Sequence, residues 1–338
     1  MFSPTIKRSA GTILNRLGLL HTYAFLKRKG IGSQVTIMWY HRISPTRDDW
    51  SLEALSPKSF ERQIVYLCRT CQILPLGKLM ACLREGKSLP DRVAAITIDD
   101  GYKDNYLYAY PILRKFQVPA TIFLTTGHIG TPNLFWWDKV GYLIQHTSVE
   151  RLRLGEHYSY RLESPTKRRY AHLSITEKLK DLPDAQKNLI IEDLVNVAGV
   201  HIPYSVGQQL ILSWTEVSEM SRNGVDFGAH TVTHPILTMT PPEEARREIA
   251  QSREDIEARV GKPVRLFSYP NGDFNAEIEG IVKELGFLAA FTCDPVWISS
   301  KSNFYELGRI GGPEDFDMFK LQWSGLWGDL RTALGSGE

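Results

Sequence analysis

A run of apolar residues that ends in two adjacent aspartates constrains this chain more than any other feature. The segment Val93 to Ile98 is rich in β-branched residues, as buried strands are, and Asp99 and Asp100 follow it directly. A core role does not explain the pair, because burying two like charges side by side is costly. We therefore expect a buried strand whose carboxyl end delivers two carboxylates to a functional site.

A pair of histidines indicates what this site holds. His230 and His234 are separated by three residues later in the chain. Together with one carboxylate, two imidazoles form a site for a divalent metal that keeps coordination positions open. The second carboxylate is then free to act as a base. This set of side chains is the equipment of metal-assisted hydrolysis.

Composition excludes several other classes of protein. The chain has 338 residues, of which 43% are apolar and 23% are charged, as in an ordinary soluble globular protein. The formal net charge of +2 gives no case for nucleic-acid binding. Four cysteines are too few for a disulfide scaffold and suggest a reducing compartment, so we expect a cytoplasmic protein.

Residues 1–30 form a basic N-terminal segment. No acidic residue precedes Asp48. Apolar residues interleave with the basic ones at helical spacing, namely Ile13, Leu14, Leu17, Leu20 and Leu26. No apolar stretch is long enough for a membrane span or a signal peptide. The segment is therefore either a helix packed on the body of the protein or an amphipathic helix lying on the anionic inner face of a membrane.

Strand-like and helix-like segments alternate along the rest of the chain. Strands are predicted over residues 35–40, 93–98, 120–125, 225–229, 264–269 and 288–292. One of the helices between them opens at Ser213 with a capping box. A βα repeat of roughly seven or eight strands favours an α/β fold in which a parallel sheet closes into a barrel. No Gly-rich phosphate loop supports the alternative, an open doubly wound sheet.

Chemically active residues follow the ends of different predicted strands. His41, Asp99, His230 and Pro270 each come just after a strand. In a (β/α) barrel the carboxyl ends of the strands converge on one face, where active sites are built. The barrel therefore predicts that these four residues meet.

Residues 131–212 interrupt the repeat. Residues 151–160 alternate like a hairpin, and residues 176–197 have the pattern of a charged helix. We interpret the segment as a mixed helical and hairpin insertion over the barrel mouth. The barrel domain then spans residues 31–325, followed by a C-terminal tail at 326–338. Trp137, near the start of the insertion, is either a wall of a substrate groove or a hydrophobic anchor.

Three motifs resemble those of a known family. Residues 97–101 and 230–234 look like the first two motifs of the polysaccharide deacetylases, the NodB-type domains of carbohydrate esterase family 4. Residues 268–272 look like a variant of the third motif. The resemblance implies a distorted (β/α) barrel. It also implies removal of acetyl groups from N-acetylated sugars of a polysaccharide. The basic N-terminal segment adds a lipid-linked precursor of that polysaccharide as an alternative substrate.

The resemblance and the chemistry together suggest roles. Asp100, His230 and His234 hold the metal, with Zn²⁺ as the default and Co²⁺, Ni²⁺ or Fe²⁺ as alternatives. Asp99 deprotonates the attacking water. A backbone N–H near Asn271 helps to hold the oxyanion, a donor worth on the order of 3 kcal/mol. Substrate contacts are also expected from Tyr102, Trp137, Tyr269 and Pro270.

The chain departs from the family pattern at the general acid. Family members usually carry an acid histidine in a Leu-x-His motif, but residues 307–310 contain no histidine. His41 resembles instead the N-terminal histidine of a circularly permuted branch that includes exopolysaccharide deacetylases. The first and last strands of a closed barrel are neighbours, so His41 could occupy the same space. It is either the general acid or a histidine hydrogen-bonded structurally at the strand end.

The third motif also differs from the common pattern. Leu266 and Ser268 stand where that pattern has arginines, one of which orients the base. Arg265 or Arg309 could replace it, and the sequence does not choose between them. Two other hypotheses stay open: a non-catalytic glycan-binding protein that keeps the barrel, and a non-haem iron oxygenase with the same ligand set, which the βα repeat disfavours.

Overall fold

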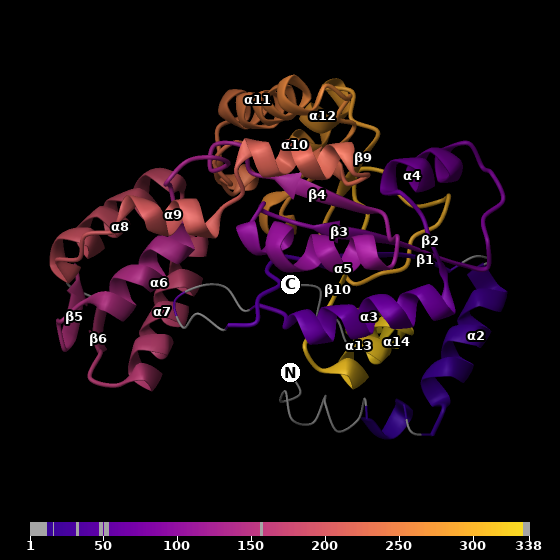
Figure 1. The fold of residues 1–338 in the computed structure, drawn as a ribbon, viewed down its shortest axis with the longest axis horizontal. Coiled ribbons are helices and arrows are strands. Elements are labelled where there is room, and N and C mark those ends of the chain that lie inside the picture. The colour runs from indigo at the N-terminus through magenta and orange to yellow at the C-terminus, as the bar shows by residue number, and fades with distance from the viewer. Residues whose placement is uncertain are drawn as a thin grey trace.

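Seven parallel strands in a curled sheet form the centre of the protein (Figure 1). The structure is a computed structural model and describes residues 12–15, 17–31, 34–46, 50, 54–155 and 158–333. The strands are β1(Gln34–Tyr40), β3(Arg92–Ile98), β4(Ala120–Leu124), β7(Asp226–Ala229), β8(Leu266–Ser268), β9(Ala289–Phe291) and β10(Ile310–Gly311). Their order is β10-β1-β3-β4-β7-β8-β9, with parallel pairing throughout. The six predicted strands are confirmed, with small shifts at their ends.

The curl of the sheet confirms the predicted distorted (β/α) barrel. β1 pairs with β10 on one side and with β3 on the other, so the first and last strands of the barrel are neighbours. Phe291 of β9 forms a parallel bridge to Leu307, just before β10, across the remaining gap. The short strand β2(Gln72–Ile73) pairs with β3 outside this order.

Both faces of the central strands are buried. Ala94 and Ile96 of β3 belong to the core between the sheet and the outer helices, and Val93 belongs to a second cluster on the opposite face. In that second cluster, the rings of Phe123 on β4 and Phe291 on β9 lie 5.5 Å apart, although these strands are not neighbours in the sheet. They therefore meet inside the curl. Burial on both faces explains why these strands read as continuous apolar runs.

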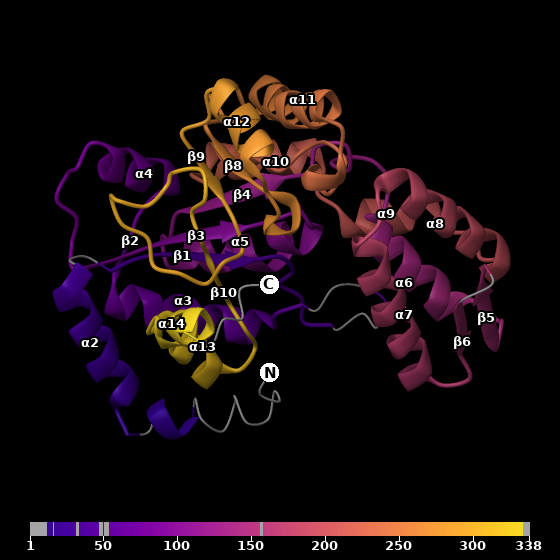
Figure 2. The ribbon, with the colours of Figure 1, turned by 180° about the vertical axis from the view of Figure 1, so that it is seen from behind.

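Helices between the strands cover the outside of the sheet (Figures 1 and 2). They are α3(Pro57–Thr70), α5(Tyr110–Lys115), α10(Trp214–Arg222), α11(Pro242–Val260), α12(Ala276–Glu284) and, after β10, α13(Phe316–Trp323). In contrast, α4(Leu76–Arg84) packs against the cluster on the inner face of the sheet. The predicted capping box of α10 is present, because Ser213 and Glu216 each accept a hydrogen bond from the other's backbone N–H. Before α5 the chain forms a π-helical turn, Asn105–Ala109, next to the polar ends of β1 and β3.

The insertion folds into a lobe beside the barrel (Figures 1 and 2). It contains α6(Trp136–His146), β5(Arg151–Leu154), β6(Tyr158–Arg161), α7(Pro165–Lys180), α8(Asp184–Ala198) and α9(Tyr204–Leu210). A hydrophobic cluster of its own includes Leu143, Leu152 and Ile175. The helical pattern expected over residues 176–197 is confirmed except at residues 181–183, between α7 and α8. The chain turns there and restarts at Pro183, which precedes α8, because proline suits the start of a helix and disrupts its interior.

Two helices near the chain ends pack together. They are α2(Leu19–Ile31) and α14(Leu326–Ala333). Lys27 of α2 donates to both carboxylate oxygens of Asp329 on α14 at 2.7 Å. The stretch assigned to a tail thus begins with a helix that α2 supports. Among the described residues, no helix combines the length and apolar character needed to cross a membrane.

We predict that Gly207→Ala destabilises the protein by about 1–3 kcal/mol, because the new Cβ would lie 1.9 Å from the backbone oxygen of Pro132. Gly280→Ala in α12 is the matched control. No atom lies within 4 Å of its Cβ position, so the better helix propensity of alanine should stabilise the protein by up to about 1 kcal/mol. Urea unfolding monitored by circular dichroism measures both. Equal effects would contradict the close packing of α9 on the loop before α6.

Candidate active site

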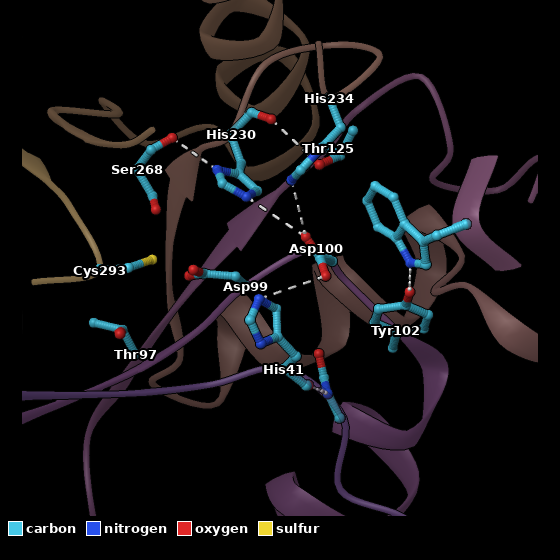
Figure 3. A network of polar contacts seen from close by, with 12 residues as sticks. His41, Thr97, Asp99, Asp100, Tyr102, Thr125, His230, His234, Ser268 and Cys293 are labelled. Atoms are coloured by element: carbon cyan, nitrogen blue, oxygen red, sulfur yellow. Dashed lines mark hydrogen bonds and ion pairs between the residues drawn. The ribbon is translucent and has the colours of Figure 1, made fainter. Parts of the chain in front are cut away.

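The ends of three strands bring the predicted site residues together (Figure 3). Asp99 and Asp100 follow β3, His41 follows β1, and His230 and His234 follow β7. Because β1 and β7 lie on either side of the β3–β4 pair in a parallel sheet, their carboxyl ends share one edge. The predicted meeting of His41, Asp99 and His230 is therefore present in the structure, and Asp100 and His234 lie with them.

Asp100, His230 and His234 form a buried cluster with the geometry of a metal site. Oδ1 of Asp100 lies 3.5 Å from Nε2 of His230 and 3.6 Å from Nε2 of His234. This oxygen is buried and has no hydrogen-bond partner among the described residues. Ligands about 2.1 Å from a tetrahedral ion lie about 3.4 Å apart, so the three atoms are spaced to share one cation. The donor set and the orphaned oxygen both fit a divalent metal.

Backbone contacts fix the orientation of both histidines. Nδ1 of His230 lies 2.7 Å from the backbone oxygen of Ser268 and must donate to it, because a carbonyl only accepts. Nε2 of His230 is then free to face Asp100. Thr231 Oγ1 accepts the backbone N–H of His234 at 3.0 Å. From α11, Glu248 accepts the backbone N–H groups of residues 232 and 233 at 2.7 and 2.9 Å.

Backbone strain is concentrated in the three motifs. Asp100 (φ 76°), Thr231 (φ 65°), His234 (φ 63°) and Asn271 (φ 58°) are in the left-handed region. Among the described non-glycine residues, only Gln117 shares a positive φ. Such residues cost of order 1–3 kcal/mol each and persist where the surroundings impose them, often at functional sites. The strain points to the same site as the side chains do.

The charges of the cluster favour the states that a cation needs. Burial alone would raise the pKa of Asp100, but three nearby imidazoles outweigh it and hold that pKa well below its usual range. Burial lowers the pKa of His234 to about 3, and His230 adds to the effect. For His230, burial is outweighed by Asp100 and Asp99, which raise its pKa. Asp100 is thus anionic and His234 neutral at physiological pH, and a cation competes with the proton of His230.

Asp99 is held by Arg309. The guanidinium donates to both carboxylate oxygens at 2.8 and 2.7 Å, and both side chains are almost completely buried. Burial alone would raise the pKa of Asp99, but the charge and hydrogen bonds of Arg309 lower it below the usual value. Arg265 is exposed beyond the other end of β8. Of the two arginines that the sequence left open, Arg309 is the one that orients Asp99.

His41 faces Asp100 from the side opposite the two other histidines. Its Nε2 lies 4.0 Å from Oδ2 of Asp100, and its side chain is 31% exposed. The ring packs edge-on against Trp39, with centroids 4.8 Å apart, and its backbone oxygen accepts from Asn105 at 2.8 Å. β10, which follows the segment without the expected histidine, lies beside β1. His41 therefore lies beside the part of the barrel where the common pattern has its acid, and its role stays a prediction.

The residues predicted to contact substrate differ in their exposure to solvent. Tyr102, Tyr269 and Pro270 are buried and offer no surface to a sugar in this structure. Trp137 is also buried, with its ring edge-on to His234 at 4.8 Å. Asn271 is exposed at the end of β8. The oxyanion role of its backbone stays a prediction.

Sequence reasoning missed a network that joins the insertion to the site. Tyr102 donates its hydroxyl hydrogen to Oδ2 of Asp138 at 2.7 Å and accepts the indole N–H of Trp137 at 2.8 Å. Asp138 is fully buried, and burial together with this carboxylate raises the pKa of Tyr102 well above its usual value. The only available signal was an acidic residue that follows two tryptophans in an apolar stretch.

Two cavities lie near the candidate site, although none of Asp99, Asp100, His230 and His234 lines either of them. A cavity of about 280 Å³ is lined by His41, Trp39 and Glu314. The second, of about 610 Å³, lies between the barrel and the lobe and is lined by His128, Thr233, Lys139 and Tyr204, among others. His41 thus faces open space, and a larger hollow lies between the barrel and the lobe.

Known proteins with similar sequences are deacetylases by name. Residues 86–290, more than half of the chain, match the family model described as polysaccharide deacetylase. YxkH of Bacillus subtilis (strain 168), named after the same family, is 22% identical over 279 residues, 82% of this chain and 71% of YxkH. The poly-beta-1,6-N-acetyl-D-glucosamine N-deacetylase of Staphylococcus aureus (strain MRSA252) is 30% identical over 141 residues, 40% of this chain and 48% of that relative.

Solved structures show the same fold. Streptococcus pyogenes deacetylase PplD, in complex with acetate, aligns with a TM-score of 0.58 at 18% identity, covering 86% of this chain and 98% of PplD. IcaB from Ammonifex degensii aligns with a TM-score of 0.56 at 18% identity, covering 87% of this chain and 98% of IcaB. Membership of a circularly permuted branch stays a prediction.

We predict that Tyr102→Phe destabilises the protein by about 1–3 kcal/mol, because it leaves Asp138 and the indole N–H of Trp137 without their shared partner. It should also weaken metal binding, since Trp137 packs on His234. Tyr106→Phe is the matched control. Its hydroxyl donates to Glu219 in a partly buried pair at 2.9 Å, where water can replace it. Chemical unfolding and zinc titration calorimetry measure both effects, and identical behaviour of the two variants would contradict the coupling.

Proposed function

The chain belongs to the polysaccharide deacetylase family, and we propose that it hydrolyses the acetamido groups of N-acetylated sugars in a polysaccharide or in its lipid-linked precursor. The observation that carries the proposal is the buried Asp100–His230–His234 cluster next to an ion-paired Asp99. A glycan-binding protein without activity has no need of Asp99 beside the cluster.

Asp100, His230 and His234 would hold the metal, with zinc as the expected ion. When bound, a divalent cation supplies Lewis acidity, which polarises a carbonyl group and lowers the pKa of water. The same two-histidine, one-carboxylate set also suits iron, cobalt or nickel. The protein's part is to keep Asp100 anionic, His234 neutral and both rings in a fixed orientation.

We assign the role of general base to Asp99. It is adjacent to Asp100 in sequence but makes its contacts with Arg309, so it is not needed as a ligand. The bidentate guanidinium fixes the plane of the carboxylate and keeps it ionised, and the remaining lone pairs can accept a proton from water. General base catalysis of this kind contributes typically about 10²–10⁴-fold.

His41 is our candidate for the general acid that protonates the departing amine. It lies on the opposite side of Asp100 from the other two histidines, and its partly exposed ring can regain a proton from solvent. Charge development on the amide oxygen would be met by a backbone N–H near Asn271.

The cavity beside His41 could accept a sugar unit. It is lined by His41 and Trp39, and the hollow between the barrel and the lobe offers further room for a longer glycan. The Staphylococcus aureus relative is named for poly-beta-1,6-N-acetyl-D-glucosamine, so oligomers of that sugar are our first substrate to test. The chain spans about half of that relative, and this choice of sugar is part of the proposal.

Acetate release from N-acetylglucosamine oligomers by zinc-loaded protein tests the function, with bound metal quantified. Wild type should release acetate. Asp99→Asn should keep its metal and lose about 10²–10⁴-fold in kcat. His234→Asn should lose the metal itself. Metal-loaded wild type that binds the oligomers without releasing acetate would instead support the glycan-binding alternative.

We predict that Arg309→Lys lowers kcat by about 10- to 100-fold with little change in KM or metal content, because lysine cannot hold both oxygens of Asp99 in one plane. Arg265→Lys, at the exposed amino-terminal end of β8, is the control and should leave kcat unchanged. Steady-state kinetics and metal analysis separate the two. A rise in KM alone would show that Arg309 does not position the base.

A further inference from the structure

Large apolar side chains are exposed along the N-terminal helical segment. Leu17 is 66% exposed, Ile13 is 57% exposed and, on α2, Leu26 is 60% and Leu19 is 46% exposed. We call these four side chains the α2 face. Isolated exposed leucines are normal on a protein surface. Together with Phe25, which is 50% exposed, the face puts five large apolar side chains within 14 residues, as interaction surfaces do.

A second face of α2, packed on the protein, fixes the orientation of the helix. Leu20 and Ala24 are buried against the body of the protein. Lys27 pairs with Asp329 of α14 and lies 4.6 Å from the centre of the Trp297 ring. Asn15, in the preceding turn, donates to Asp317 at 2.6 Å. The α2 face therefore cannot turn inward without breaking these contacts.

The charge of the segment selects the chemistry of the partner. Residues 1–31 contain no acidic residue and six basic ones, Lys7, Arg8, Arg16, Lys27, Arg28 and Lys29. Of these, Lys27 is paired within the protein. Exposed leucines in a segment that carries basic but no acidic residues are the composition of a helix that lies in the interface of an anionic bilayer.

The position of α2 leaves the candidate active site free. α2 immediately precedes β1, so it lies at the amino end of that strand, whereas His41 follows the carboxyl end. Figures 1 and 2 both place α2 and the insertion lobe at opposite ends of the protein. A surface bound to α2 would therefore not cover the cluster or the two cavities beside it.

We propose that the α2 face binds the surface of membranes that contain anionic lipids and holds the protein there peripherally. This interaction does not depend on the proposed reaction. The apolar side chains of the α2 face would enter the bilayer interface, while the basic residues of the segment would contact the anionic headgroups.

Flotation of the full-length chain with lipid vesicles tests the proposal. Wild type should float with vesicles of phosphatidylcholine and phosphatidylglycerol, much less with phosphatidylcholine alone, and less at high salt. Leu17→Ser/Leu26→Ser should lower the partition coefficient at least about tenfold. The control is Leu173→Ser/Leu189→Ser on the lobe, where the two side chains are 54% and 66% exposed and should not matter.

Far-UV circular dichroism and the unfolding midpoint verify that both double variants fold, without reference to any activity. Equal flotation of wild type and Leu17→Ser/Leu26→Ser would overturn the proposal. So would equal binding to neutral and anionic vesicles. The alternative partner of the α2 face is a second copy of the chain, which sedimentation equilibrium tests. A wild-type dimer that Leu17→Ser/Leu26→Ser dissociates would show that the α2 face binds this second copy instead of a membrane.

Discussion

The buried ion pair between Asp99 and Arg309 holds the carboxyl end of the barrel together. Asp99 ends β3, and Arg309 directly precedes β10, so the pair spans the interior of the curl. The guanidinium also donates to the backbone oxygen of Thr292 after β9 and to Ser268 at the end of β8. Removing one partner of such a pair typically costs about 3–5 kcal/mol, because the other charge stays buried and unpaired. One side chain thus fixes the base and the ends of four strands.

A rigid frame of this kind explains how the motifs can carry strain. Asp100, Thr231 and His234 have positive φ angles, which are uncommon outside glycine although aspartate and histidine tolerate them better than most residues. Thr231 is the most demanding because its side chain is β-branched. Its hydroxyl accepts the backbone N–H of His234, and Glu248 of α11 accepts the backbone N–H of Val232. These hydrogen bonds hold the loop in its strained conformation. The surrounding hydrogen bonds offset the conformational cost of these residues and so keep the proposed ligands in fixed positions.

Local patterns predicted the strands, the barrel and the clustering of the histidines with the two aspartates. The carboxyl ends of the strands can be recognised in the sequence because a buried parallel strand is apolar along its whole length, and a polar residue such as Asp99 follows it. Arg309 could not be chosen over Arg265, because that choice depends on which residues face the inside of the curl. The burial of Tyr102 and Tyr269 was equally hidden, since an aromatic residue after a strand has the same pattern whether it faces sugar or core. These features follow from the closure of the sheet, which no short window of sequence encodes.

The insertion is part of the site rather than an appendage. Trp137 and Asp138 belong to its first helix, yet they contact His234 and Tyr102, which belong to the barrel motifs. Tyr102 lies two residues after the metal-ligand candidate Asp100, and its hydroxyl bonds Asp138 and Trp137 of the lobe. Trp137 in turn packs against His234, so the lobe is connected to two of the candidate ligands. A lobe with its own hydrophobic core can vary in its outer helices while this contact stays constant. Substitutions at the root of α6 should therefore disturb the candidate metal cluster itself, whereas substitutions at the outer surface of the lobe should leave it intact.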